Sequence, residues 1–397
     1  MNSLIRLTGD FQTARGSQPG PATLPAKGVV TAEKIARIRK SLETVLSEWP
    51  KDAIVEDILV SVEYRQIVAK SNRIREMLNG GKGYEPELSI CGARYLDFGG
   101  DRPRHLMTHY VPEATIQSTI DKLCECERIT VNHFDGLMSA DKMVDLVKND
   151  RLKQKWNTAI SCMLTRSVYA QLIRDCYYVN KYKIENPPAA KDENAIVTLF
   201  KTEREPQDLF KELGIDVSPA NFLENSVLLT ETEYRTLLEL APYLVAMSVT
   251  DLSSYTPMND SGSTPPAISS LPEYPNDEPI IGVIDTPFEE NYPPYFSNWV
   301  DYRSCLPEGI NPTPSDYRHG TCVSSLIVDV QAQNPSLDDH CGHFRVRHFG
   351  VATAGKFSSF AVMKHIERIV AENQDIKVWN ISLGSREEVS RNSISPE

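Results

Sequence analysis

Hydrophobic and polar positions follow two different periods along the first part of the chain. After Thr31, apolar residues recur every three or four positions, which predicts a helix with Thr31 as its N-cap. The apolar positions of this helix are Ile35, Ile38, Leu42, Val45 and Trp49. Over residues 58–64 apolar residues alternate with others, which predicts a strand. The charged stretch around Ile74 and Met77 predicts a second helix with a solvated basic face.

Between residues 104 and 250 the pattern predicts a mixture of strands and helices. Strands are predicted over 104–111, 194–202 and 243–249, and helices over 112–127 and 231–240. The later helix begins with a T-x-x-E capping box formed by Thr230 and Glu233. Residues 140–182 are expected to be mainly helical, and no repeat of fixed period is visible.

The pattern changes after residue 250 and divides the chain into four segments. Residues 1–30 are rich in Gly, Pro, Ser and Thr and are predicted to be disordered. A mixed α+β, helix-rich region follows over 31–250, and a Ser- and Pro-dense linker over 251–277. In the last segment, 278–397, the run PIIGVID is apolar on both faces and stops at Asp285. Such a run predicts a strand buried inside a parallel sheet, and so an α/β domain.

Composition excludes several classes of function. The length of 397 residues predicts two or three domains, and a hydrophobic content of 41% is enough for their cores. The net charge of -12 argues against an extended nucleic-acid surface. No run approaches the roughly 18 apolar residues that a membrane helix needs, and the N-terminus lacks the apolar core of a signal peptide. Eight cysteines without a CxxC pair indicate free thiols, so we expect a cytoplasmic protein. From the charge and the absence of a long apolar run, we expect no nucleic-acid partner and no membrane partner.

Three polar motifs in the last segment are candidates for chemistry. Asp285 ends a strand, where sites form in open parallel sheets, although an Asp there more often caps a turn or a helix. His319-Gly320-Thr321 opens a helix, so His319 is either a general base or a hydrogen-bonded helix-terminal histidine. The run KVWNISLGS, residues 377–385, predicts another buried strand whose polar edge could pair with an extended peptide. Cys341 and His343 have no second ligand pair, so no metal site is expected.

Taken together, these motifs resemble those of the subtilisin-like serine peptidases, the subtilases, whose catalytic residues follow the chain order Asp, His, Ser. The run HGTCVSSLI fits the family's histidine signature at every restricted position, and VIDT fits its aspartate motif. Pro287 stands where the family normally has Gly. The run FRVRHFGVATAGKFSSF is similar to the family's strand, substrate-edge loop and helix start. The resemblance covers residues 278–397.

The resemblance implies a subtilisin-like parallel sheet with flanking helices, present in part, and a peptidase site that acts on polypeptides. Asp285 would orient His319, and His319 would transfer the proton of a serine nucleophile. The residues implied in binding the substrate backbone are Ser382, Leu383 and Gly384 on one side and Thr353, Ala354 and Gly355 on the other. No cofactor is required. Calcium is possible, but its loop ligands have no spacing that can be read from the sequence.

One part of the family's site is missing from the sequence. The nucleophile motif, Gly-Thr-Ser followed by small residues, does not occur, and neither does the oxyanion-hole asparagine after the SLG strand. We therefore expect this chain to be the front part of a longer endopeptidase, truncated before its serine and inactive alone. An inactive module that binds peptides or a regulatory partner is the alternative. The Asp285–His319 pair favours the enzyme, and Pro287 favours the module. Some intracellular subtilases work beside AAA-type ATPases, so an ATPase or regulatory partner is possible, and the region 31–250 is either a propeptide or an accessory domain.

Overall fold

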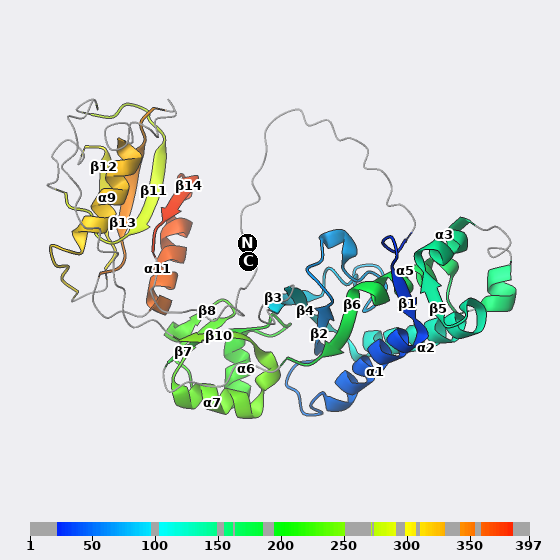
Figure 1. Cartoon of the computed structure of the whole chain (residues 1–397). Coiled ribbons are helices and arrows are strands. Elements are labelled where there is room, and N and C mark those ends of the chain that lie inside the picture. Colours follow the sequence, from blue (N-terminus) through cyan, green and yellow to red (C-terminus); the bar gives the residue numbers. More distant parts are fainter. Residues whose placement is uncertain are drawn as a thin grey trace. The chain divides into compact units, whose positions relative to one another are not determined.

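The structure is a computed structural model, and its described residues form two compact units (Figure 1). The described residues are 22–96, 103–148, 155–161, 163–185, 194–250, 271, 274–290, 298–306, 310–329, 342–353 and 359–383. The first unit contains residues up to 185 together with 200–204, and the second contains 194–199 and 205–383. In these ranges, none of the helices has both the length and the apolar character needed to cross a bilayer.

An antiparallel sheet and three helices make the core of the first unit. The strand order is β3 (Ile90–Leu96), β4 (Arg104–Val111), β2 (Ile58–Tyr64) and β6 (Val179–Lys183). The packed helices are α1 (Ala32–Glu48), α2 (Glu113–Phe134) and α5 (Arg166–Tyr178). Smaller elements are β1 (Val29–Thr31) paired with β5 (Leu137–Ser139), and α3 (Ala140–Lys148). The Thr31 cap is confirmed, since its side chain accepts a hydrogen bond from the Lys34 N–H, and the strands predicted at 58–64 and 104–111 are confirmed.

One prediction for this unit is wrong. The stretch around Met77 is not a helix, because the N–H groups of Arg75, Glu76 and Met77 donate to the carboxylate of Asp175 in α5 instead of forming helical bonds. The expectation that residues 140–182 are mainly helical is confirmed by α3, the π-helix Trp156–Ile160 and α5, and the stretch ends in strand β6, whose residues pair with β2. The error at Met77 comes from a contact with a residue far away in the sequence.

The second unit contains a small antiparallel sheet in the order β10 (Val245–Thr250), β7 (Ala195–Leu199), β9 (Ser226–Leu229) and β8 (Phe222–Leu223). Helices α6 (Pro206–Glu212) and α7 (Glu231–Leu240) accompany it. The capping box is confirmed, because the Glu233 carboxylate accepts the Thr230 N–H at 2.7 Å while the Thr230 hydroxyl accepts the Glu233 N–H. The predicted strands 194–202 and 243–249 are found as β7 and β10, each a little shifted.

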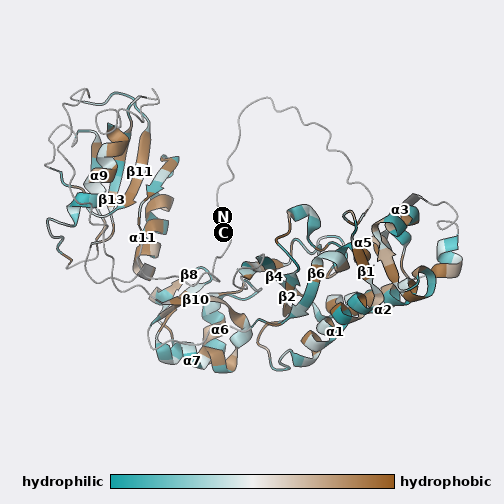
Figure 2. Cartoon of the chain, viewed as in Figure 1, coloured by the Kyte–Doolittle hydropathy of each residue, from teal (hydrophilic) through white to brown (hydrophobic). Residues whose placement is uncertain are grey.

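The second unit also contains a four-stranded parallel sheet, which carries the sequence motifs. Its order is β12 (Val300–Ser304), β13 (Arg345–Gly350), β11 (Ile280–Asp285) and β14 (Val378–Ile381). Val283 packs with Val328 of helix α9 (Tyr317–Val328) in one apolar cluster. Its neighbour Ile284 packs with Ile369 of helix α11 (Ser359–Glu372) in another. Helices on both faces explain why β11 is apolar on both sides, and Figure 2 shows this strand in brown.

Strand β14 differs from its prediction. Val378 is 57% exposed and Ile381 is 49% exposed, whereas the sequence predicts a buried strand. The reason is its place in the sheet, because β14 pairs with β11 and lies at the edge of the four strands that the described residues form. An apolar run alone does not distinguish a central strand from an edge strand.

Candidate active site

Asp285 lies at the carboxyl end of the central strand β11 and is fully buried. Its backbone carbonyl accepts a hydrogen bond from the Val351 N–H at 2.8 Å, which continues the pairing with β13 beyond the end of that strand. Its Oδ1 accepts the Thr286 N–H at 2.6 Å. Its Oδ2 is buried and has no hydrogen-bond partner among the described residues. The carboxyl group is therefore fixed by one oxygen only.

His319 is the third residue of α9, and its imidazole meets this carboxyl group. The distance from His319 Nδ1 to Asp285 Oδ1 is 2.6 Å. A carboxylate oxygen can only accept, so Nδ1 carries a proton, and in the neutral form of the ring Nε2 keeps a lone pair. The side chain is 24% exposed, and Nε2 has no hydrogen bond to any residue in the described ranges. A neutral imidazole with one nitrogen held and the other open is the arrangement of a general base.

Gly320 allows α9 to approach the segment after Asp285. The Gly320 N–H donates to Thr286 Oγ1 at 2.9 Å. A Cβ atom at this position would lie far inside van der Waals contact with the Thr286 carbonyl oxygen and 2.8 Å from the Pro287 carbonyl oxygen. Glycine is thus required here by space. The hydrogen bond from the Glu289 N–H to Thr321 Oγ1, at 2.8 Å, ties the same segment to α9 a second time.

Burial opposes the negative charge on Asp285. Desolvation raises the pKa of this carboxyl above its ordinary value, and the hydrogen bonds from His319 and Thr286 partly offset the rise. A carboxylate held in a poorly solvated place interacts strongly with a neighbouring positive charge. Asp285 is therefore suited to stabilise His319 at the moment when the imidazole becomes protonated.

A second buried histidine lies beside the pair, and the sequence analysis missed it. His348 in β13 contacts the Ser324 hydroxyl through Nδ1 at 2.8 Å and the Thr286 carbonyl oxygen through Nε2 at 2.7 Å. Both His348 and Ser324 are fully buried. A histidine in the middle of the apolar strand run FRVRHFG was the available signal, because a buried polar side chain needs partners.

The residues expected to bind substrate follow the carboxyl ends of the strands that flank β11. Thr353 is buried just after β13. Ser382 lies just after β14, where its hydroxyl is hydrogen-bonded to the Asn380 amide, and Leu383 packs against the α11 side of the sheet. Gly384, Ala354 and Gly355 lie outside the described residues. The carboxyl ends of parallel strands meet at one edge, so Thr353 and Ser382 lie at the same edge of the sheet as Asp285.

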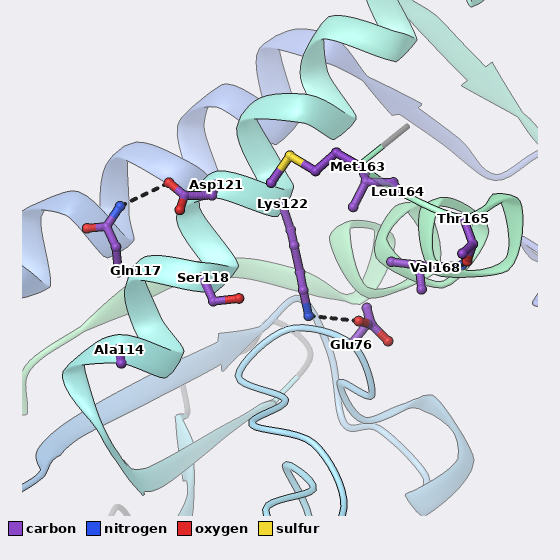
Figure 3. A pocket seen from close by; sticks show the side chains of 10 residues that line it. All are labelled: Glu76, Ala114, Gln117, Ser118, Asp121, Lys122, Met163, Leu164, Thr165 and Val168. Carbon is purple, nitrogen blue, oxygen red and sulfur yellow. Dashed lines mark hydrogen bonds and ion pairs between the residues drawn. The ribbon is translucent and has the colours of Figure 1, made fainter. Parts of the chain in front are cut away.

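The first unit has a hollow of about 430 Å³ beside α2 and α5 (Figure 3). The charged and amide side chains that line this hollow form hydrogen bonds and ion pairs with one another. Lys122 Nζ lies 2.9 Å from Glu76 Oε1, and the Gln117 amide donates to Asp121 at 3.0 Å. Each charged side chain that lines the hollow, Glu76, Asp121 or Lys122, is therefore paired with a neighbour. Within the described ranges, no cluster of His, Cys, Asp and Glu side chains could hold a metal ion.

Comparison with known families gives one match for this chain. Residues 276–396 match the model of the subtilase family. That range contains the whole parallel sheet, Asp285 and His319. Among curated proteins, no match to the chain was found.

Proposed function

We propose that residues 276–396, which match the model of the subtilase family, carry the Asp-His part of a serine endopeptidase site. The match makes this region a peptidase, and so a hydrolase, by resemblance. The observation that carries the finer proposal is the 2.6 Å hydrogen bond between His319 Nδ1 and Asp285 Oδ1, with Nε2 left open. Asp285 is the orienting carboxylate, and His319 is the general base.

The chemistry follows from this tautomer. His319 Nε2 takes the proton from a serine hydroxyl as that oxygen attacks the peptide carbonyl carbon, and then gives the proton to the leaving amine. Asp285 holds the ring in place and stabilises the imidazolium in between. The peptide substrate lies extended between the segment that begins at Ser382 and the segment that begins at Thr353.

The nucleophile is proposed to come from a segment joined to this chain. The Gly-Thr-Ser motif that the resemblance requires does not occur in the 397 residues. The structure supports a further segment at one place, the outer edge of β14. In the described part of the chain no strand pairs with that edge, and Val378 and Ile381 are about half exposed there. The unpaired N–H and C=O groups of such an edge can pair with a further strand.

The remaining parts of the proposal concern setting and partners. The region 31–250 is proposed to restrain the peptidase region or to recruit a regulatory protein such as an ATPase, in the cytoplasm. The domain boundaries at 250 and 278 belong to this proposal.

The test is hydrolysis of casein by the longer polypeptide that contains this chain and supplies the serine. The wild type is expected to cleave casein, and His319→Ala is expected to abolish cleavage while leaving the protein folded. A Ser325→Ala variant, on the exposed side of the same helix, is the matched control and should retain activity. Absence of cleavage by the folded wild type, with the region 31–250 removed by proteolysis, contradicts the proposal.

The same experiment separates the enzyme from a peptide-binding module. Pro287, in the position where the family has Gly, is the feature that favours such a module. A module of this kind would retain unfolded casein in a pull-down without cutting it, and His319→Ala would not change the amount retained.

A further inference from the structure

We propose that His348 is a positioning residue for the Asp285–His319 pair, because its imidazole pins the Thr286 carbonyl oxygen beneath helix α9. The consequence for catalysis rests on the function proposed above. The consequence for geometry does not, because it concerns the hydrogen bond between Asp285 and His319 in this chain. His348 does not touch the reacting groups in this role. It acts through Thr286.

The hydrogen bonds of His348 select one neutral tautomer of its imidazole. The Thr286 carbonyl oxygen can only accept, so His348 Nε2 carries the proton and donates at 2.7 Å. Nδ1 therefore holds a lone pair and accepts the Ser324 hydroxyl at 2.8 Å. The rings of Phe288 and Tyr302 lie against the imidazole, with centroid distances of 5.8 and 5.6 Å. Every polar atom of this fully buried side chain is thus satisfied in the neutral form.

Thr286 transmits this constraint to the catalytic pair through three separate atoms. Its N–H donates to Asp285 Oδ1, the oxygen that receives His319. Its Oγ1 accepts the N–H of Gly320, the residue that follows His319. Its carbonyl oxygen lies directly below Gly320, where no Cβ could fit. A movement of the Thr286 peptide therefore changes the carboxyl group and the helix together.

The hydrogen bonds from Ser324 to His348 and from His348 to Thr286 join three elements. Ser324 comes from α9, His348 from β13, and Thr286 from the segment after β11. When the partner of a buried hydrogen-bonding group is removed, the group that remains is destabilised, and a short loop can shift or a water molecule can enter to satisfy it. A displacement of about 1 Å at a catalytic pair lowers rates by about 100-fold.

The decisive variants separate the hydrogen bond from the volume of the ring. His348→Phe keeps a ring of similar size and removes both hydrogen bonds. His348→Gln returns an N–H donor toward Thr286 and is the conservative rescue. His109→Phe is the matched control, because His109 in β4 is also buried and also pairs with a serine hydroxyl, that of Ser89 at 3.0 Å.

The first measurement is NMR of the imidazole N–H groups in the 397-residue chain, which needs no peptidase activity. The His319 Nδ1–H signal, shifted far downfield by the short bond to Asp285, is expected in the wild type, in His348→Gln and in His109→Phe. It is expected to disappear in His348→Phe. If His348→Phe does not fold, Ser324→Ala takes its place, because it removes the hydroxyl donor from His348 Nδ1 and changes little else. That variant is expected to weaken the His319 signal.

The second measurement is peptide hydrolysis by the longer polypeptide. We expect His348→Phe to lower kcat by about 100-fold with KM within about twofold, and His348→Gln to recover at least a tenth of the wild-type kcat. A His319 signal and kcat that survive in His348→Phe overturn the inference, as does equal loss in His109→Phe. Loss of the signal in a polypeptide that hydrolyses nothing supports the positioning role and contradicts the proposed peptidase instead.

Discussion

Two buried aspartates, one in each unit, show how a structural carboxylate differs from a reactive one. Asp175 is 1% exposed, and both of its oxygens are satisfied. Oδ2 accepts the three successive N–H groups of residues 75–77 at 3.0, 2.8 and 3.1 Å, and Oδ1 accepts the Gln171 amide at 2.8 Å. Asp285 is equally buried, but one oxygen takes both hydrogen bonds and the other takes none in the described ranges.

The difference lies in what each carboxylate serves. Asp175 takes the place of the carbonyl oxygens that would accept the N–H groups of residues 75–77 in a helix. Its negative charge therefore stabilises the loop that contains these residues. The 2.6 Å hydrogen bond of Asp285 holds His319, whose side chain reaches solvent, and its second oxygen has no hydrogen-bond partner in the described ranges, which lowers stability. A fold tolerates such a cost mainly where chemistry requires it. Substitutions at the two sites should therefore affect different quantities.

The largest expected effect is on catalysis at Asp285. Asp285→Asn keeps the shape of the side chain but removes the charge that fixes the Nδ1–H tautomer of His319. We expect kcat/KM of the serine-containing polypeptide to fall by about 10⁴-fold, with little change in its unfolding midpoint. Peptide hydrolysis and thermal unfolding measured on the same preparation check this. Activity within tenfold of the wild type would remove Asp285 from the mechanism.

The next effect is on stability at Asp175. Asp175→Ala leaves three N–H groups without their acceptor and should lower the free energy of unfolding by about 4 kcal/mol. Urea unfolding of the whole chain measures the loss, and hydrogen exchange should show it first at the amides of residues 75–77. Asp175→Asn keeps an acceptor oxygen and should lose about half as much. An unchanged exchange rate at these amides would contradict the assignment of a structural role.

A smaller effect is expected at Gly320, where packing and chemistry meet. Gly320→Ala places a methyl group against the Thr286 carbonyl oxygen, so α9 must move away from the segment after Asp285. We expect a loss of about 3 kcal/mol in unfolding free energy together with loss of the His319 Nδ1–H signal. Ser325→Ala in the same helix serves as the control and should change neither. Retention of the signal in a folded Gly320→Ala protein would show that the close approach is not needed.

The smallest effect concerns pH and extends the comparison to two buried histidines, His109 and His348. Burial lowers the pKa of each to about 4, so both are neutral in the folded protein. The unfolded chain binds a proton at each below about pH 6.5, so this stability is present above that pH and is lost as pH falls toward 4. We expect each histidine to lower the unfolding free energy by about 2 kcal/mol between pH 7.5 and 5.

Urea unfolding at those two pH values measures the total. His109→Phe and His348→Phe should each reduce the change in unfolding free energy between these two pH values by about 2 kcal/mol, whatever they do to stability at pH 7.5. A variant that keeps the full pH dependence would show that its histidine already becomes protonated within the fold.

Local sequence predicted the elements whose signals are local. The Thr31 cap, the box of Thr230 and Glu233, and the buried strand ending at Asp285 were all correct. Each depends on residues within a few positions or on the burial of a single strand. The pairing of Asp285 with His319 was also predictable, because a resemblance supplied the distant partner that periodicity could not.

What the sequence did not show depends on distant contacts. Asp175 lies about one hundred positions from the loop that it holds, so charged residues with helical spacing near Met77 were misleading. The exposure of Val378 depends on which strands flank β14. The residues next to Ser324 in the sequence give no sign of its hydrogen-bond partner, and only the position of β13 in space shows that this partner is His348.

His319 and His348 hold opposite tautomers, and the groups that select these tautomers belong to two adjacent residues, Asp285 and Thr286. Asp285 fixes the proton on Nδ1 of one ring, and the carbonyl of the next residue fixes it on Nε2 of the other. In the course of descent, these positions are therefore not free to vary one at a time. If His348 is replaced by an apolar residue during evolution, Ser324 must be replaced too, because its buried hydroxyl would otherwise lose its hydrogen-bond partner. We expect the two positions to be inherited and replaced as a pair.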